Sequence, residues 1–144
     1  MKSKIQFFLI IGLAILGLVG YGYFKATPGI ENQTGSLPKI EISPQLFDFG
    51  EVEYGQVAEY TFKVKNAGSA ILEIKKVATS CACTTAKIAK EKINPGEEVN
   101  LQVVYNTGAM SGPHAKGEQE RIIYVKNNDP INPQVEVMIT AYVK

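Results

Sequence analysis

Tryptophan is absent from this sequence of 144 residues, and histidine occurs once. Charge of neither sign dominates, because 15 Lys and Arg residues stand against 14 Asp and Glu residues and leave a formal net charge of +1. Proteins that bind nucleic acid carry a basic surface that neutralises phosphates, so this balance argues against nucleic acid as a partner. The charges are also scattered along the chain, and we expect neither a polybasic tail nor an acidic arm.

Cysteine is scarce, since the chain has only Cys81 and Cys83. Small secreted domains that depend on disulfides carry a larger framework of spaced cysteines. The stability of this protein must therefore come from a hydrophobic core, and 45% of its residues are hydrophobic. The length leaves room for about one domain.

The usual catalytic motifs are missing as well. No glycine-rich phosphate loop follows a strand and opens a helix, and paired carboxylates beside an aromatic cleft are not apparent. The sole histidine, His114, lies three residues after Ser111 on one loop. A hydrolase would need a third group to orient the histidine base, and none is evident. We interpret His114 as an exposed loop residue, and we expect neither an enzyme nor a bound cofactor.

A long apolar run occupies residues 5–24, IQFFLIIGLAILGLVGYGYF, and contains no charge. A helix of this length spans about 30 Å, the thickness of the hydrocarbon layer of a membrane. Lys2 and Lys4 precede it, so the positive-inside rule leaves residues 1–4 in the cytoplasm. We expect a single-pass membrane anchor, with everything after Lys25 on the non-cytoplasmic side.

A cleaved signal peptide is the competing interpretation of this run. Such peptides have an apolar region of about 7–15 residues and a small-x-small cleavage site. Here the apolar run is longer, and the one candidate site, Gly20-Tyr21-Gly22, is a poor match. No cysteine stands directly after the run, which argues against a lipoprotein. We therefore favour a retained signal-anchor helix over cleavage.

Residues 25–39, KATPGIENQTGSLPK, have the composition of a linker, because proline and glycine interrupt a small, polar sequence. From residue 40 to 144 the hydrophobic pattern has a period of two, which predicts strands with one buried face. Turn signals rich in Gly, Asn and Pro separate these strands. The expected strands cover residues 41–43, 47–52, 59–65, 71–77, 98–105, 121–126 and 135–143.

This spacing predicts an all-β fold, a seven-stranded immunoglobulin-like β-sandwich preceded by the transmembrane helix. One strand breaks the alternation, since Leu72 and Ile74 share a face but Val77 falls on the other. A β-bulge near Lys75 and Lys76 would reconcile them.

An ordered set of motifs resembles a bacterial domain-of-unknown-function family, the one numbered 1573. The motifs are Phe47-Asp48-Phe49-Gly50-Glu51-Val52, Val64-Lys65-Asn66-Ala67-Gly68, Ser80-Cys81-Ala82-Cys83-Thr84-Thr85, Asn94-Pro95-Gly96-Glu97 and Asn128-Asp129-Pro130. That family is similar to the Ig-like domains of Hydin and of the major sperm protein group. The resemblance covers about residues 40–144 and implies a seven-stranded sandwich, export from a bacterial cytoplasm, and a role as an interaction or scaffold domain without established activity. With the anchor, it leads us to expect a single-pass protein of the bacterial inner membrane whose C-terminal domain lies in the periplasm. This sequence departs from the family in having Ala82 where the family usually has Gly.

Three interpretations of Cys81 and Cys83 stay open. In an extended strand, residues two apart lie about 6.6 Å from each other, at the edge of the range of Cα separations for a disulfide. A kink at Ala82 would make such a bond easier, and the small loop would be readily reduced. Alternatively both thiols pack in the core as small apolar groups.

The third interpretation is a site for copper or zinc. Two thiolates suit Cu(I) or Zn, and Met110 and His114 would add ligands if the loop at 106–117 folds towards the pair.

We expect a membrane-anchored, non-cytoplasmic interaction module, an accessory subunit of a bacterial envelope complex with protein partners in the cell envelope. Sandwich domains recruit partners by strand addition at an edge or through end loops. The loop at 107–117 and the strand at 47–50 are candidate contact surfaces, although Phe47 and Phe49 fit the core better. The alternative is an exported redox or metal-handling protein that uses Cys81 and Cys83.

Overall fold

The computed structural model describes residues 35–112 and 114–144. The cytoplasmic segment 1–4, the transmembrane helix at 5–24 and most of the linker lie outside the described residues. Within the described part, no helix is long and apolar enough to cross a membrane. The β-rich part forms one compact unit, Ser36–Lys144.

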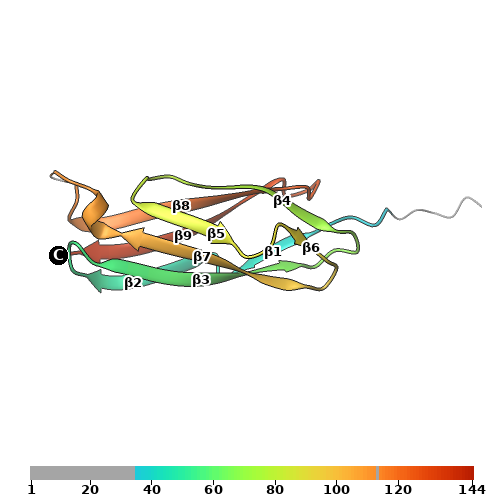
Figure 1. Cartoon of the computed structure of the whole chain (residues 1–144), viewed down its shortest axis with the longest axis horizontal. Helices are drawn as coiled ribbons and strands as arrows, with labels where there is room; N and C mark the ends of the chain where they lie inside the picture. Colours follow the sequence, from blue (N-terminus) through green and yellow to red (C-terminus); the bar gives the residue numbers. More distant parts are fainter. Residues whose placement is uncertain (1–34, 113) are drawn as a thin grey trace, which may run out of the picture. The chain divides into compact units, whose positions relative to one another are not determined.

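This unit is an all-β sandwich of two packed sheets (Figure 1). One sheet has the strand order β1-β3-β7-β5 and the other the order β2-β9-β8-β4-β6. Neighbouring strands are antiparallel, apart from β2, which runs parallel to β9. The strands are β1 (Ile40–Ser43), β2 (Leu46–Val52), β3 (Val57–Asn66), β4 (Leu72–Thr79), β5 (Thr84–Ile88), β6 (Lys92–Ile93), β7 (Glu98–Asn106), β8 (Gly117–Asn127) and β9 (Gln134–Val143), and the short 3-10 helix η1 covers Thr107–Ala109.

The expected count of seven strands is wrong, because the described residues form nine. The two strands that the pattern did not predict are β5 and β6. Strand β6 has two residues, too few to show an alternation. Strand β5 reads TTAKI, and its small and polar residues give only a weak apolar signal next to the cysteine motif.

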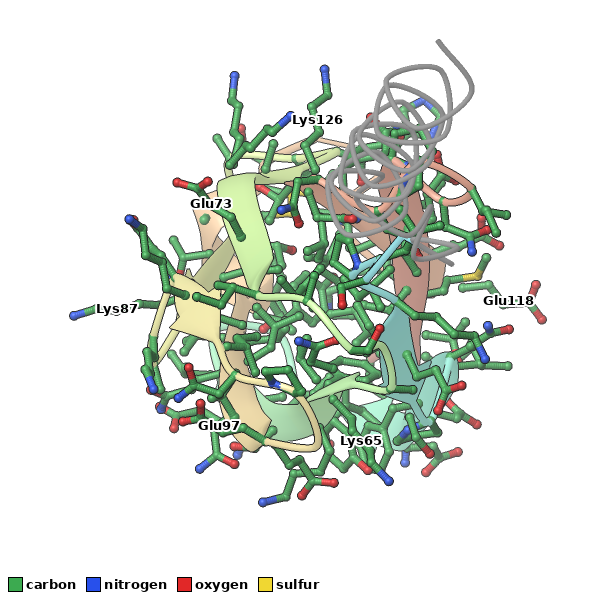
Figure 2. All side chains as sticks on the ribbon, turned by 90° about the vertical axis from the view of Figure 1, so that its right-hand side faces the viewer. Lys65, Glu73, Lys87, Glu97, Glu118 and Lys126 are labelled. Atoms are coloured by element: carbon green, nitrogen blue, oxygen red, sulfur yellow. A yellow bond between two sulfur atoms is a disulfide. The ribbon has the colours of Figure 1, made fainter. Side chains whose placement is uncertain are left out.

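The core lies between the two sheets and follows the predicted alternation. Phe62 on β3, Leu101 on β7 and Ile123 on β8 are each 0% exposed. Charged side chains such as those of Lys87 and Glu118 point outward, on opposite sides of the domain in Figure 2. This division between apolar interior and charged surface is what the period of two requires.

The predicted bulge in β4 is confirmed. Ile74 pairs with Asn127 and Lys76 with Lys126, so the register shifts by one residue between them. Lys75 and Lys76 are both exposed as a result, while Val77 is half-buried. The bulge therefore places two consecutive lysines on the surface of the domain.

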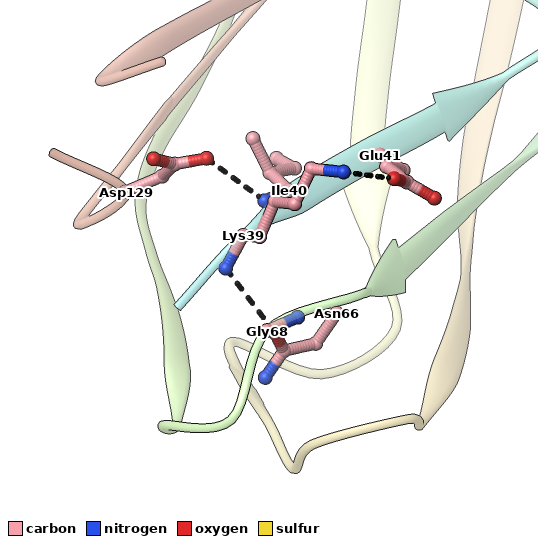
Figure 3. Close-up of polar contacts among 6 residues, drawn as sticks. All are labelled: Lys39, Ile40, Glu41, Asn66, Gly68 and Asp129. Atoms are coloured by element: carbon pink, nitrogen blue, oxygen red, sulfur yellow. Dashed lines mark hydrogen bonds and ion pairs between the residues drawn. The ribbon is translucent and has the colours of Figure 1, made fainter. Parts of the chain in front are cut away.

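Two buried polar residues hold the beginning of β1 in place. The backbone N–H of Ile40 donates to Asp129 Oδ2 at 3.0 Å, and that of Lys39 donates to Asn66 Oδ1 at 3.4 Å (Figure 3). Asn66 Oδ1 also accepts from Gly68 N at 3.0 Å. These contacts lie at the end of the domain where the chain enters β1.

Candidate functional site

Cys81 and Cys83 lie in the turn that joins β4 to β5, and a disulfide links them. Figure 1 shows this turn at the end of the domain opposite to the start of β1. The two Cα atoms are 5.1 Å apart, closer than the separation expected in an extended strand. The pair is unevenly accessible, because Cys81 is half-buried whereas Cys83 is 3% exposed.

Local hydrogen bonds explain why the chain turns here. Thr84 N donates to the carbonyl oxygen of Cys81 at 3.1 Å, which closes a tight turn. Thr79 Oγ1 lies 3.1 Å from the same oxygen and 2.9 Å from the carbonyl oxygen of Thr84. Among the described residues only glycines have positive φ, so Ala82 takes this turn without left-handed backbone. The departure from the family's glycine is thus accommodated.

The chain's single arginine, Arg121, contacts the buried sulfur. Its Nε donates to Cys83 Sγ at 3.1 Å. Arg121 lies on β8 in the inward-facing register of Ile123 and Val125, both 0% exposed. A guanidinium is always charged, so a permanent positive charge is held against one of the two sulfur atoms.

Further contacts fix the orientation of this guanidinium. Its Nη2 atom donates to Met110 Sδ at 2.8 Å and to Gln119 Oε1. Its Cζ atom lies 5.6 Å from the centre of the Tyr105 ring, within the range of a cation–π contact. Burial raises the pKa of Tyr105, and the nearby Arg121 charge opposes that rise. The tyrosine therefore stays neutral beside the arginine at physiological pH.

Of the two further ligands proposed for a metal, Met110 shares a partner with the cysteine pair, because its Sδ atom and Cys83 Sγ both accept from Arg121. Met110 Sδ faces Arg121, as described, and His114 is exposed. The carbonyl oxygen of His114 accepts from Gln119 Nε2 at 3.1 Å, which ties its loop to the start of β8. In the part of the chain that the structure describes, no group of three or more His, Cys, Asp or Glu residues is placed to hold a metal ion.

The aromatic residues of β2 belong mainly to the sandwich interior. Phe47 and Phe49 are partly buried and pack against the core. The Phe47 ring stacks on that of Tyr60 with centres 3.5 Å apart. This part of the strand at 47–50 offers little free apolar surface for a partner.

A second feature is a groove of about 260 Å³ between β4 and β5. Strand β5 is the edge of its sheet and pairs with β7 alone. Strand β4 is covered by β6 at Leu72 and Glu73, and Ile74 N donates to the carbonyl oxygen of Glu91 at 2.8 Å. Beyond Ile74, β4 pairs only with β8. Two open strand edges therefore flank the groove, whose lining residues are Ile74, Lys75, Lys76, Val77, Ala86, Lys87, Ile88 and Glu91.

Sequence reasoning found the cysteine pair but missed Arg121 and the groove. The signal for Arg121 was present, because the alternation of β8 places it on the face of Ile123 and Val125. A lone charged residue in a core-facing register marks a position with a specific partner. The groove had no such signal, since it depends on β5 and on the end of β6.

Two mostly antiparallel sheets that pack on a common core define an immunoglobulin-like β-sandwich. The chain belongs to the family described as "Protein of unknown function (DUF1573)", whose model matches residues 40–143. The resemblance seen in the sequence motifs is thereby confirmed. No protein among curated sequences matches the chain.

Solved structures are similar in fold. A protein of unknown function from Porphyromonas gingivalis aligns with a TM-score of 0.66 and 22% identity, over 73% of this chain and 46% of that one. The PapD-like domain 7 of human CEP192 gives a TM-score of 0.55 and 11% identity, over 75% of this chain and 87% of that one. The YadV chaperone gives a TM-score of 0.54 and 14% identity, over 73% of this chain and 52% of that one. The chain thus spans about half of the first and third of these proteins, and identities this low show the fold alone.

Proposed function

We propose that this chain is a protein-interaction module that residues 5–24 hold in a bacterial inner membrane, with the sandwich on the periplasmic side. The apolar run and the preceding Lys2 and Lys4 support the anchor and its orientation. As proposed, the module serves as an accessory subunit of an envelope complex and has no catalytic role. The observation that supports the interaction role is the groove between the open edges of β4 and β5.

The partner that fits this groove is an extended segment of another protein. An open strand edge offers backbone N–H and C=O groups in a row, and an added strand satisfies them. The half-buried side chains of Val77, Ala86 and Ile88 would receive every second side chain of that segment. The volume of about 260 Å³ suits individual side chains better than a whole small ligand.

The charge around the groove specifies the segment further. Lys75, Lys76 and Lys87 are exposed along it, and Glu91 is the one acidic residue of its lining. Lys87 projects well away from the domain (Figure 2). A segment with alternating apolar and acidic residues complements this surface, because its acidic side chains would meet the lysines.

Peptide titration tests the proposal. The full-length protein in detergent is titrated with an eight-residue peptide of alternating Val and Glu, and with its Val–Lys counterpart, while amide chemical shifts are recorded. We expect the acidic peptide alone to bind, with shifts concentrated on β5 and the second half of β4. The double variant Lys76→Glu/Lys87→Glu should reverse the preference in favour of the basic peptide.

The matched control is Lys63→Glu/Lys65→Glu, on β3, which is paired on both sides by β1 and β7. This variant should keep the preference for the acidic peptide. Equal binding of both peptides, shifts away from β4 and β5, or a reversed preference in the β3 control would each refute the proposal.

A further inference from the structure

We propose that Cys81 and Cys83 form a thiol–disulfide exchange site in which a dithiol attacks Cys81 and Cys83 leaves as a thiolate held by Arg121. This inference goes beyond the proposed interaction and does not depend on it. It rests on the unequal surroundings of the two sulfur atoms.

Access selects the sulfur that is attacked. An incoming thiolate must reach one sulfur in line with the bond that breaks. Cys81 is half-buried and the adjacent Ala82 is exposed, so the turn presents Cys81 to solvent. Cys83 is 3% exposed and covered on one side by Arg121. Cys81 is therefore the sulfur that a reductant can reach.

Charge selects the sulfur that leaves. The leaving atom takes up the electron pair of the broken bond and becomes negative, so the bond breaks faster when that negative charge is stabilised. Arg121 Nε already donates to Cys83 Sγ at 3.1 Å, and Thr84 Oγ1 lies 3.7 Å from the same sulfur. Met110, Gln119 and the Tyr105 ring hold the guanidinium in this position. Access and charge thus favour the same direction of cleavage.

The balanced reaction has two steps. The first thiolate of the dithiol bonds to Cys81 Sγ, the bond between the cysteines breaks, and its electron pair stays on Cys83 Sγ. The second thiolate then attacks the reductant's own sulfur in the mixed disulfide and expels Cys81 as a thiolate, which takes a proton from water. The protein gains two electrons, and the dithiol is oxidised to a disulfide. Cys83 N lies 3.0 Å from Cys81 Sγ and can donate to it as charge develops there.

The first test follows thiolate formation in the reduced full-length protein in detergent, through ultraviolet absorbance as a function of pH. An ordinary cysteine forms its thiolate with a midpoint at about pH 8.5, and a nearby arginine brings this midpoint down to about pH 7.5 or below. We expect one thiolate per protein with such a lowered midpoint. Two ordinary midpoints in the wild-type protein would overturn the proposal, and this measurement needs no variant.

Variants then assign the effect to Arg121. In Arg121→Met the lowered midpoint should disappear, and reduction of the disulfide by dithiothreitol should slow about three- to tenfold. Arg121→Lys, which keeps the positive charge, should recover part of both effects. The control Lys126→Met removes a charge from an exposed position on the same strand and should change neither. An Arg121→Met protein that is reduced at the wild-type rate would refute the assignment.

The site of attack is tested with a monothiol. Wild-type protein is treated with 2-mercaptoethanol, the free thiol is alkylated, and fragment masses locate both groups. We expect the mercaptoethanol adduct on Cys81 and the alkyl group on Cys83. The opposite arrangement, or an even mixture, would contradict the proposed direction of cleavage.

Discussion

Asp129 Oδ2 accepts a hydrogen bond from the backbone N–H of Ile40 at 3.0 Å, across 89 residues of sequence. The other carboxylate oxygen accepts from the backbone N–H groups of Ile131 at 2.8 Å and Asn132 at 3.2 Å. One carboxylate that is 1% exposed thus joins the start of β1 to the turn between β8 and β9. The motif Asn128-Asp129-Pro130 seen in the sequence has this structural role.

Replacing this carboxylate should destabilise the sandwich. In Asp129→Asn one oxygen becomes an NH2 group, which cannot accept a hydrogen bond, so either the N–H of Ile40 or the N–H groups at 131 and 132 lose their acceptor. Hydrogen bonds to charged groups contribute about 1.5–3 kcal/mol each, so we expect a loss of about 2–4 kcal/mol in the free energy of unfolding. Urea denaturation of residues 36–144, followed by circular dichroism, measures it. Glu118→Gln, an exposed change of the same kind, should be neutral within about 0.5 kcal/mol.

The same residue predicts how stability depends on pH. Burial raises the pKa of Asp129, but the backbone donors of Ile131, Ile40 and Asn132 outweigh it, and the pKa lies below the ordinary 3.8. A carboxylate whose pKa is lowered by folding stabilises the protein above that ordinary value, and the contribution is lost as the pH falls through the lowered pKa.

Wild-type protein should therefore lose stability below about pH 4 more steeply than Asp129→Asn does. Urea midpoints recorded for both proteins between pH 7 and pH 2.5 give the comparison. Exposed carboxylates such as Glu41, whose pKa is lowered by a hydrogen bond from Lys39, are present in both proteins. Their contributions to the pH dependence therefore cancel in the difference between the two profiles. Parallel pH profiles would show that Asp129 is not the group responsible.

The alternation of apolar residues was sufficient to predict the sandwich. Long strands such as β3, β7 and β9 bury most of one face, so each shows the period of two over most of its length. The bulge at Lys75 and Lys76 was also visible, because it breaks that period. Strands β5 and β6 escaped notice since their pairing is determined by contacts with β7 and β4 rather than by their own composition.

The candidate site was only half visible in the sequence for a similar reason. Two cysteines in three residues are conspicuous anywhere, but the partner of Cys83 lies 38 residues away. That partner is identified only once β8 has been placed beside β4 and the turn at 80–83, where Ser80 N donates to the carbonyl oxygen of Ile122. The groove depends in addition on the short length of β6, which pairs with β4 only at Leu72 and Glu73, and the hydrophobic pattern does not encode that length.

A glycine next to β1 should tolerate no side chain. A Cβ atom on Gly68 would lie 2.2 Å from the carbonyl oxygen of Leu37 and 2.5 Å from the backbone N of Lys39. Both are backbone atoms, which cannot rotate away. We expect Gly68→Ala to cost about 1–3 kcal/mol, because the segment before β1 must move.

The matched control is Gly35→Ala, whose added Cβ would meet nothing within 4 Å. Urea denaturation of both variants in a chain of residues 35–144 makes the comparison. Hydrogen exchange at Ala67 and Ser69, whose N–H groups donate to Lys39 and Leu37, should rise in Gly68→Ala alone. Equal stability of the two variants would show that the segment before β1 adapts at no cost.

Reduction of the Cys81–Cys83 disulfide should leave the domain folded. A disulfide stabilises chiefly by restricting the unfolded chain, and the restriction grows with loop length. A loop of three residues corresponds to about 1–2 kcal/mol on that scale, a minor part of the stability of a domain of this size. The core, whose largest members include Phe62 and Leu101 at 0% exposure, does not depend on the bond.

Urea midpoints with and without dithiothreitol measure the difference, and Cys81→Ser/Cys83→Ser is the control that dithiothreitol should not affect. A wild-type protein that unfolds on reduction would contradict this prediction. A domain that stays folded keeps the reduced Cys81 and Cys83 together in the β4–β5 turn, where they can be oxidised to the disulfide again.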